Sequence, residues 1–123
     1  MSISPQELCQ IEIQVDDLDR SVQFYQNVFG WSPVPAEIHE VTVLDVPQEC
    51  PYGISLVPGR HSKAADKGRI VLYFESKDPK ALVDRALENG GTLRFGPKKL
   101  RGYGEIYQIV DPNGIRFGLF RKS

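Results

Sequence analysis

Histidine, cysteine and glutamate are the side chains with which metal or nucleophilic chemistry would begin in this sequence. The chain has 123 residues and only two histidines, whereas most metal sites need three or four imidazole, thiolate or carboxylate ligands. His39 lies in the run Glu37-Ile38-His39-Glu40, where Glu37 and His39 would share one face of a strand. His61 lies in a polar stretch. We interpret both histidines as solvated side chains, and their roles stay open.

The two cysteines form no recognised redox or metal motif. Cys9 and Cys50 make no C-x-x-C pair, so we expect reduced thiols in the cytoplasm. No serine or cysteine pattern beside the histidines predicts a nucleophilic triad. Residue alternation places Cys9 on the helix-covered side of a strand, where a structural thiol is expected.

Composition is typical of one globular domain, expected to span residues 1–123. Hydrophobic residues make up 41% and charged residues 25% of the chain, which is ordinary for a folded protein. The 15 Lys and Arg nearly balance the 16 Asp and Glu, and the net charge of −1 predicts no nucleic-acid partner. Apolar runs are short and no leader-like segment opens the chain, so we expect a cytoplasmic protein without membrane contact.

The first half of the chain is predicted to form a strand, a helix and three further strands. Residues 9–15 alternate apolar and polar side chains, as a half-buried strand does. Asp17 is a good N-cap, and apolar residues then recur every three or four positions until Gly30, which predicts a helix. Strand-like segments follow up to Val46 and again at 53–57. A polar linker is expected over 59–68.

The second half repeats this plan. A strand over 69–75 precedes a helix capped by Asp78, and strands are expected over 92–100, 104–110 and 115–120. Asp78 lies 61 positions after Asp17, and the strands before these two residues align at the same offset. We therefore predict an α+β fold of two β-α-β-β-β modules, about 8–58 and 69–121, forming a curved mixed sheet.

Two runs resemble the vicinal oxygen chelate superfamily, which includes glyoxalase I, bleomycin-resistance proteins and extradiol dioxygenases. The first is Glu-Ile-Gln-Val-Asp-Asp-Leu-Asp-Arg-Ser-Val-Gln-Phe-Tyr-Gln-Asn-Val-Phe-Gly-Trp at 12–31, and the second is Tyr-Gln-Ile-Val-Asp-Pro-Asn-Gly-Ile-Arg-Phe-Gly-Leu-Phe at 107–120. The stretch Gly102-Tyr103-Gly104-Glu105 is similar to single-domain, glyoxalase-related members. The resemblance covers nearly the whole chain and implies the two-module fold and a homodimer. It selects no function, because this superfamily hosts isomerisation, dioxygenation, ring opening and ligand sequestration.

In the metal-dependent members, four ligands, mostly His and Glu, come from the first and last strands of each module. The resemblance implies that these positions fall on Gln10, Ser55, Arg69 and Gly118. An amide oxygen can bind a metal, but a neutral hydroxyl is a poor ligand, a guanidinium is a permanent cation and glycine has no side chain. We therefore predict no metal and no other cofactor.

The sheet face away from the helices carries polar, charged and aromatic side chains. On a curved sheet this face would be a cup with hydrogen-bond donors, arginine and aromatic walls, which suits a small organic ligand. A solvated sheet face is the alternative. The predicted ligand-binding residues are Gln10, Gln14, Ser55, Arg69, Tyr73, Arg116, Phe120 and Tyr103.

Three features beside this cup were open to more than one interpretation. Trp31 either stacks at the rim or packs at the end of the first helix. Glu12 and Glu75 form a buried charge network beside Arg69, or surface pairs of little energy. Gly102, Gly104 and the basic residues Lys98, Lys99 and Arg101 form either a mobile loop near the mouth of the cup or a solvated strand or turn.

Binding or sequestration of a small organic ligand is the favoured function, rather than catalysis. One alternative is a metal-dependent lyase or isomerase resembling glyoxalase I (lactoylglutathione lyase). Another is a metal-free enzyme with Glu12 or Glu75 as general base, which would require desolvation to raise the pKa of that glutamate. The ligand's identity stays open, as does the question whether one chain or a dimer forms the cup.

Overall fold

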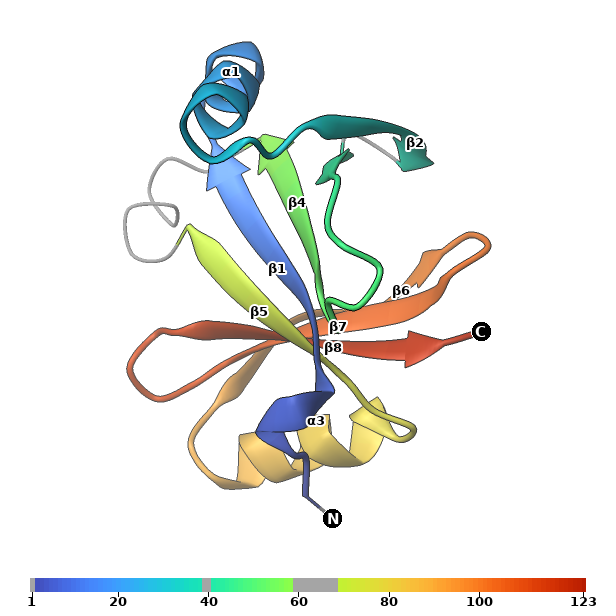
Figure 1. Cartoon of the computed structure of the whole chain (residues 1–123). Coiled ribbons are helices and arrows are strands. Elements are labelled where there is room, and N and C mark those ends of the chain that lie inside the picture. Colours follow the sequence, from blue (N-terminus) through green and yellow to red (C-terminus); the bar gives the residue numbers. More distant parts are fainter. Residues whose placement is uncertain (1, 39–40, 59–68) are drawn as a thin grey trace. The chain divides into compact units, whose positions relative to one another are not determined.

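The computed structural model describes residues 2–38, 41–58 and 69–123 of the chain (Figure 1). His39, His61 and the expected linker over 59–68 lie outside the described residues. The elements are η1 (Pro5–Glu7), β1 (Leu8–Val15), α1 (Leu18–Phe29), β2 (Pro33–Ile38), β3 (Val41–Leu44), β4 (Gly53–Pro58), β5 (Ile70–Glu75), α3 (Pro79–Glu88), β6 (Thr92–Leu100), β7 (Gly104–Val110) and β8 (Arg116–Lys122). Apart from the short 3-10 helix η1, each of these elements corresponds to a predicted one.

Both α-helices begin at the predicted caps. The Asp17 carboxylate accepts a hydrogen bond from the backbone N–H of Arg20 at 3.1 Å, and Asp78 accepts one from Ala81 at 3.2 Å. These bonds satisfy N–H groups that have no partner within the helix. α1 ends at Gly30, whose φ of 77° lies in the left-handed region that glycine adopts at low cost.

Contacts divide the chain into two compact units. The first unit is Gln10–Ile70, and the second unit combines Met1–Cys9 with Val71–Ser123. In the first unit the strands lie in the order β2-β3-β4-β1, with β1 parallel to β4. The core of the first unit consists of Val15, Leu44, Ile54 and Leu56, and α1 packs Leu18, Val22 and Tyr25 against it.

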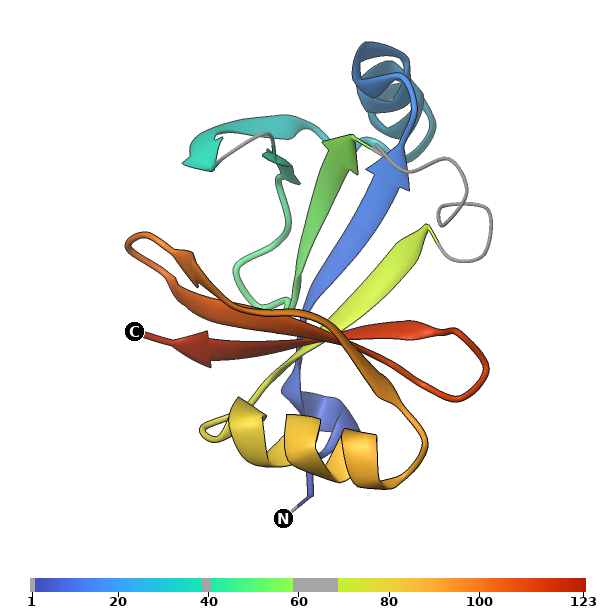
Figure 2. The same cartoon turned by 180° about the vertical axis from the view of Figure 1, so that it is seen from behind.

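The second unit has the same order of pairing. Its strands lie in the order β5-β8-β7-β6, with β5 parallel to β8 and the other pairs antiparallel. The helix α3, yellow in Figure 2, packs against the strands β6, β7 and β8. The core of the second unit consists of Val83, Tyr107 and Leu119, with Ile3, Leu82 and Ile109 packed around it.

The strand registers bear out the internal repeat. Ile11 of β1 lies opposite Ile54 of β4, and Leu72 of β5 lies opposite Phe117 of β8. In both units the first strand of the module therefore pairs in parallel with the last strand, after a helical crossover. The prediction of an α+β fold with two β-α-β-β-β modules is confirmed. The module boundaries remain a prediction, because residues 2–9 contact the second unit.

One detail differs from the alternation pattern, which would place Ile70 and Ile115 on the apolar, helix-facing side. They are 57% and 50% exposed, because Ile70 is the first residue of β5 and Ile115 precedes β8. Lys98 and Lys99 belong to β6, within the strand expected over 92–100, and only residues 101–103 form the turn before β7.

The described residues contain no helix that is both long and apolar enough to span a membrane.

Candidate functional site

Alternation along paired strands determines which side chains share a sheet face in the second unit. Tyr107 and Leu119 lie opposite each other and pack with Val83 of α3. Gln108 and Gly118 are the next pair along, so they lie on the face away from α3. The face away from α3 therefore carries the polar side chain of Gln108.

A tyrosine ring covers Gly118 on this face. Tyr73 of β5 lies directly opposite Gly118 of β8, and a Cβ atom at position 118 would collide with the ring of Tyr73. Tyr73 is 4% exposed and its phenol oxygen accepts a hydrogen bond from Gln108 Nε2 at 2.6 Å. The ring therefore occupies the space that a side chain at position 118 would need.

The hydrogen bonds continue from Gln108 to Arg94. Arg94 Nη1 donates to Gln108 Oε1 at 3.1 Å, and the Arg94 guanidinium lies 5.6 Å from the centre of the Phe95 ring. Arg94 and Gln108 were not among the predicted site residues, because they lie on β6 and β7 and the apolar–polar alternation was used only for the four central strands. Extending it to β6 and β7 would have placed both on this face.

In the first unit, Gln10 and Ser55 lie where the sequence suggested polar groups. Gln10 of β1 lies opposite Gly53 of β4, and its amide oxygen lies 2.5 Å from the position that a Cβ atom on Gly53 would take. Gly53 therefore makes room for the Gln10 amide. Ser55 lies opposite Glu12 and is 4% exposed.

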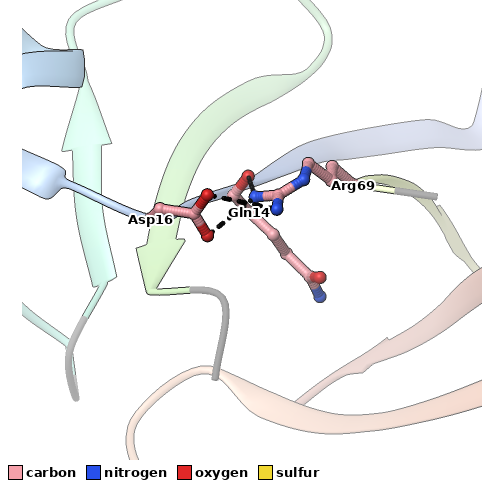
Figure 3. Close-up of polar contacts among 3 residues, drawn as sticks. All are labelled: Gln14, Asp16 and Arg69. Carbon is pink, nitrogen blue, oxygen red and sulfur yellow. Dashed lines mark hydrogen bonds and ion pairs between the residues drawn. The ribbon is translucent and has the colours of Figure 1, made fainter. Parts of the chain in front are cut away.

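Arg69 forms a two-pronged ion pair with Asp16 (Figure 3). Its Nη1 and Nη2 atoms lie 3.1 and 3.2 Å from the two carboxylate oxygens of Asp16. Nη1 also donates to the backbone oxygen of Gln14 at 3.5 Å. The side chains are 37% and 73% exposed, so solvent screens the pair and its net contribution is small. Beside it, a shallow depression of about 430 Å³ is also lined by Arg20, Phe24 and Tyr25.

The predicted charge network around Arg69 does not match these contacts, because Arg69 pairs with Asp16. Glu12 Oε1 accepts a weak hydrogen bond from Gln14 Nε2 at 3.5 Å. Glu75 Oε2 lies 3.9 Å from Lys122 Nζ, and both side chains are more than a third exposed. The alternative of surface pairs therefore describes Glu75.

The remaining candidate residues differ in exposure. Arg116 is buried at 9% exposure, and Phe120 lies opposite Glu75 and Ile106 with intermediate burial. Tyr103 is half-exposed in the turn between β6 and β7. Trp31 stacks on Phe29 at 4.8 Å, so it packs at the end of α1 and the rim position was wrong.

The third of the four implied metal positions depends on how the two modules are aligned. At the sequence offset of 61 positions between the modules, Gln10 corresponds to Val71, whereas the resemblance implied Arg69, which lies before β5. Both assignments stay predictions. Val71 is 0% exposed and has no donor atom.

The resulting residues do not fit a metal of this family. Gln10 offers one neutral amide oxygen and Ser55 a hydroxyl, whereas Val71 and Gly118 offer no ligand at all. Divalent transition metals need imidazole, thiolate or carboxylate groups. Across the described residues, no three His, Cys, Asp or Glu side chains gather in a way that could hold a metal ion.

Cys9 lies half-buried at the beginning of β1. Its Sγ donates to the backbone oxygen of Tyr73 at 3.4 Å. Burial, together with the smaller effect of the nearby Glu75 carboxylate, raises the pKa of the Cys9 thiol from 9.0 to about 11. The thiol is therefore protonated at neutral pH, as a structural cysteine would be.

We predict that Cys9 is alkylated slowly in the folded protein. In a Cys50→Ser variant, the iodoacetamide rate at Cys9 should rise about tenfold per pH unit up to about pH 10, and in urea it should level off near pH 9. Because the pKa is higher in the folded state, this thiol stabilises the fold below pH 9 and the stabilisation is lost between pH 9 and 11. A plateau near pH 9 in the folded protein would contradict this assignment.

We predict that Gly118→Ala destabilises the protein by about 1–3 kcal/mol, because the added methyl group collides with the Tyr73 ring. Urea unfolding measures this difference. The matched control is the same substitution in a Tyr73→Ser background, where the ring is gone and the loss should largely disappear. Equal losses in both backgrounds would show that the ring does not occupy this space.

Two curated proteins are similar to this chain over most of its length. The chain is 27% identical over 119 residues to "Lactoylglutathione lyase GLX1" of Arabidopsis thaliana, covering 89% of this chain and 42% of that protein. It is also 27% identical over 125 residues to "Anthracycline biosynthesis protein DauV" of Streptomyces sp. (strain C5), covering 87% and 44%. The chain therefore spans less than half the length of these curated relatives.

Solved structures share the fold. The methylmalonyl-CoA epimerase of Mycobacterium tuberculosis superposes with a TM-score of 0.69 at 24% identity, covering 95% of this chain and 88% of that chain. A variant of the Streptomyces coelicolor methylmalonyl-CoA epimerase, in complex with 2-nitronate-propionyl-CoA, gives a TM-score of 0.65 at 18% identity, covering 99% of both chains. The family model matches residues 8–119. This chain belongs to the Glyoxalase/Bleomycin resistance protein/Dioxygenase superfamily.

Proposed function

We propose that this chain binds a small organic ligand without using a metal ion. The observation that carries the proposal is the chemistry at the four positions where metal-dependent members are expected to hold their ligands. Gln10 and Ser55 are neutral, Val71 is apolar, and Gly118 lies beneath the Tyr73 ring. A donor set of this kind favours hydrogen bonding to an organic molecule over coordination of a cation.

The polar sheet faces support ligand binding. Ser55, Gln108 and Arg116 are buried at 4%, 2% and 9% exposure, and within the described residues every buried polar side-chain atom has a hydrogen-bond partner. Apolar side chains would stabilise a purely structural face better, and convergent polar groups are typical of ligand sites. In the first unit the proposed ligand-binding residues are Gln10, Gln14, Ser55 and Arg69. In the second unit they are Tyr73, Arg116, Phe120 and Tyr103.

Arg94 joins the proposed residues of the second unit. A guanidinium carries five N–H donors, and the hydrogen bond to Gln108 uses one of them. Gln108 is in turn bonded to Tyr73, so two nearly inaccessible side chains orient an exposed cation. We expect the ligand to carry a carboxylate or another hydrogen-bond acceptor that Arg94 can contact.

The names of the curated relatives suggest a competing function. One is a lactoylglutathione lyase, and a metal-dependent lyase or isomerase would require ligands other than the four positions above. Another is a protein of anthracycline biosynthesis, a name compatible with a role in handling an aromatic natural product. Both relatives are more than twice as long as the part that matches this chain. Their activities are therefore used only to choose the probes for the tests below.

We predict that the protein, purified without chelator or nickel affinity, contains less than about 0.1 equivalents of Zn, Ni, Mn or Fe by elemental mass spectrometry, because its donor set is neutral. Added Zn²⁺ or Ni²⁺ should not raise its melting temperature. Bleomycin, an anthracycline and S-lactoylglutathione are the first organic probes, and a bound probe should raise the melting temperature with concentration.

An Arg94→Gln variant should bind the successful probe at least about tenfold more weakly, because it loses the charge-assisted contact. Lys80→Gln on α3 is the control for charge, because Lys80 is exposed and paired with Asp84. A stoichiometric metal, or metal-dependent formation of S-lactoylglutathione from methylglyoxal and glutathione, would overturn the proposal.

We infer that a second copy of the chain covers the exposed face of α1. Phe24, Val28 and Phe29 are 55%, 57% and 53% exposed, and residues 21–36 contain no charged side chain. Interface cores are depleted in charge and enriched in aromatic residues, and an uncharged face can meet its own copy across a twofold axis without repulsion.

Light scattering should therefore give about twice the monomer mass, 13.9 kDa, and Phe24→Glu should shift the protein to monomer by placing two like charges at the interface. Lys77→Glu is the control, because Lys77 is exposed outside α1. A monomeric wild-type protein would contradict this inference.

A further inference from the structure

Charge is unevenly distributed along this nearly neutral chain. Residues 92–123 contain seven Lys and Arg but two Asp and Glu, whereas the rest of the chain contains eight Lys and Arg and 14 Asp and Glu. The last three strands are therefore strongly basic. Such an excess produces a local positive potential even when the net charge is close to zero.

Part of this excess gathers around a hollow at the turn between β6 and β7. The hollow has a volume of about 290 Å³ and is lined by Lys99, Arg101, Arg121 and Lys122, together with Glu105 and the backbone of the turn. Lys99, Glu105 and Arg121 lie opposite one another across three neighbouring strands. The register alone therefore places two cations on either side of one carboxylate.

Backbone contacts hold the turn against β8. Gly104 packs so closely on the backbone of Arg121 that a Cβ atom would collide with it. The Tyr103 N–H donates to Leu100 at 2.9 Å, and the Ser123 N–H donates to Tyr103 at 3.0 Å. The hollow is therefore formed without a rearrangement of the turn, which lowers the entropic cost of binding.

Only two of the four cationic side chains at the hollow, Arg121 and Lys122, are close to a carboxylate of the described residues. Glu105, 15% exposed, pairs with Arg121 Nη2 at 2.6 Å, and Lys122 lies 3.9 Å from Glu75. Within the described part of the chain, Lys99 and Arg101 make no ion pair, and both are exposed. Like charges brought together in this way repel one another, and an anion between them would relieve that repulsion.

This hollow lies on a different face from the proposed ligand site. Glu105 and Arg121 are two residues from Tyr107 and Leu119 on their strands, so they lie on the face that packs against α3. Tyr73 and Gln108 lie on the opposite face. Of the proposed ligand-binding residues only Tyr103 belongs to the turn that forms the hollow, and the inference uses the charges of Lys99 and Arg101, which are not among those residues.

We propose that this hollow is a binding site for the phosphate groups of a small di- or triphosphate. Arg101 presents a planar guanidinium that matches phosphate oxygens, and Lys99 adds a point charge. The volume is at the lower end of small-molecule sites, so it accommodates a diphosphate while the remainder of an organic ligand stays outside. A polynucleotide is disfavoured, because the basic groups surround one hollow rather than follow a groove.

Isothermal titration with inorganic pyrophosphate and with ADP, at low ionic strength, tests the proposal. Wild-type protein should bind both, and the Lys99→Gln/Arg101→Gln double variant should bind each at least about tenfold more weakly, because both unpaired charges are lost. Lys77→Gln/Lys80→Gln is the matched control, with the same change of net charge at exposed positions of the same unit, and it should stay within about twofold of wild type.

Equal affinity for pyrophosphate and ADP would mean that the site recognises the phosphate groups alone. Tighter binding of ADP would mean that the organic group of the ligand adds contacts. Both outcomes support the site. The proposal is overturned if neither probe binds at millimolar concentration, if the control variant weakens binding as much as the double variant, or if a single-stranded oligonucleotide displaces pyrophosphate at equal phosphate concentration. Circular dichroism of both variants checks that they remain folded.

Discussion

Parallel pairing between the first and last strands of each module is the constraint on which the rest of the structure depends. Parallel neighbours cannot be joined by a tight turn, so each module needs a crossover, which includes α1 in one unit and α3 in the other. The pairing also decides which side chains meet across strands. It places Gln10 opposite Gly53 and Tyr73 opposite Gly118. In both pairs the glycine leaves room for the larger partner to lie across the neighbouring strand.

The two sheet faces of the second unit follow from this pairing and have different energetics. On the α3 side, Tyr107, Leu119 and Val83 exclude water, and burial of apolar surface stabilises the unit. On the other side, Tyr73 and Gln108 are equally inaccessible but polar, and their hydrogen bonds offset the cost of desolvation. A bonded polar network of this kind is rigid, which is what a recognition surface requires. The Tyr73 ring in this network fills the space beside Gly118, one of the positions where the resemblance implies a metal ligand.

Charged groups are arranged according to their exposure. The Arg69–Asp16 pair is solvent-screened and holds the segment before β5 against the end of β1, where the Gln14 N–H also donates to the Arg69 backbone oxygen at 2.7 Å. Glu105 is far less exposed and forms an ion pair with Arg121. The stretch from Ser21 to Ala36, which includes the aromatic contact of Phe29 with Trp31, carries no charge, while the last strands are basic. The net charge of −1 for the whole chain indicates neither the uncharged stretch nor the basic strands.

The sequence by itself determined the elements and their order, because caps such as Asp17 and Asp78 and strand alternation depend only on neighbouring residues. It also predicted that the family's metal positions lack suitable donors, since glycine at position 118 has no side chain. It could not determine that Arg69 pairs with Asp16, or that Arg94 and Gln108 join Tyr73. These facts depend on strand register and on contacts between residues far apart in the chain. Only the tertiary structure decided them, because a shift of one residue in register would have turned each of these side chains to the other face.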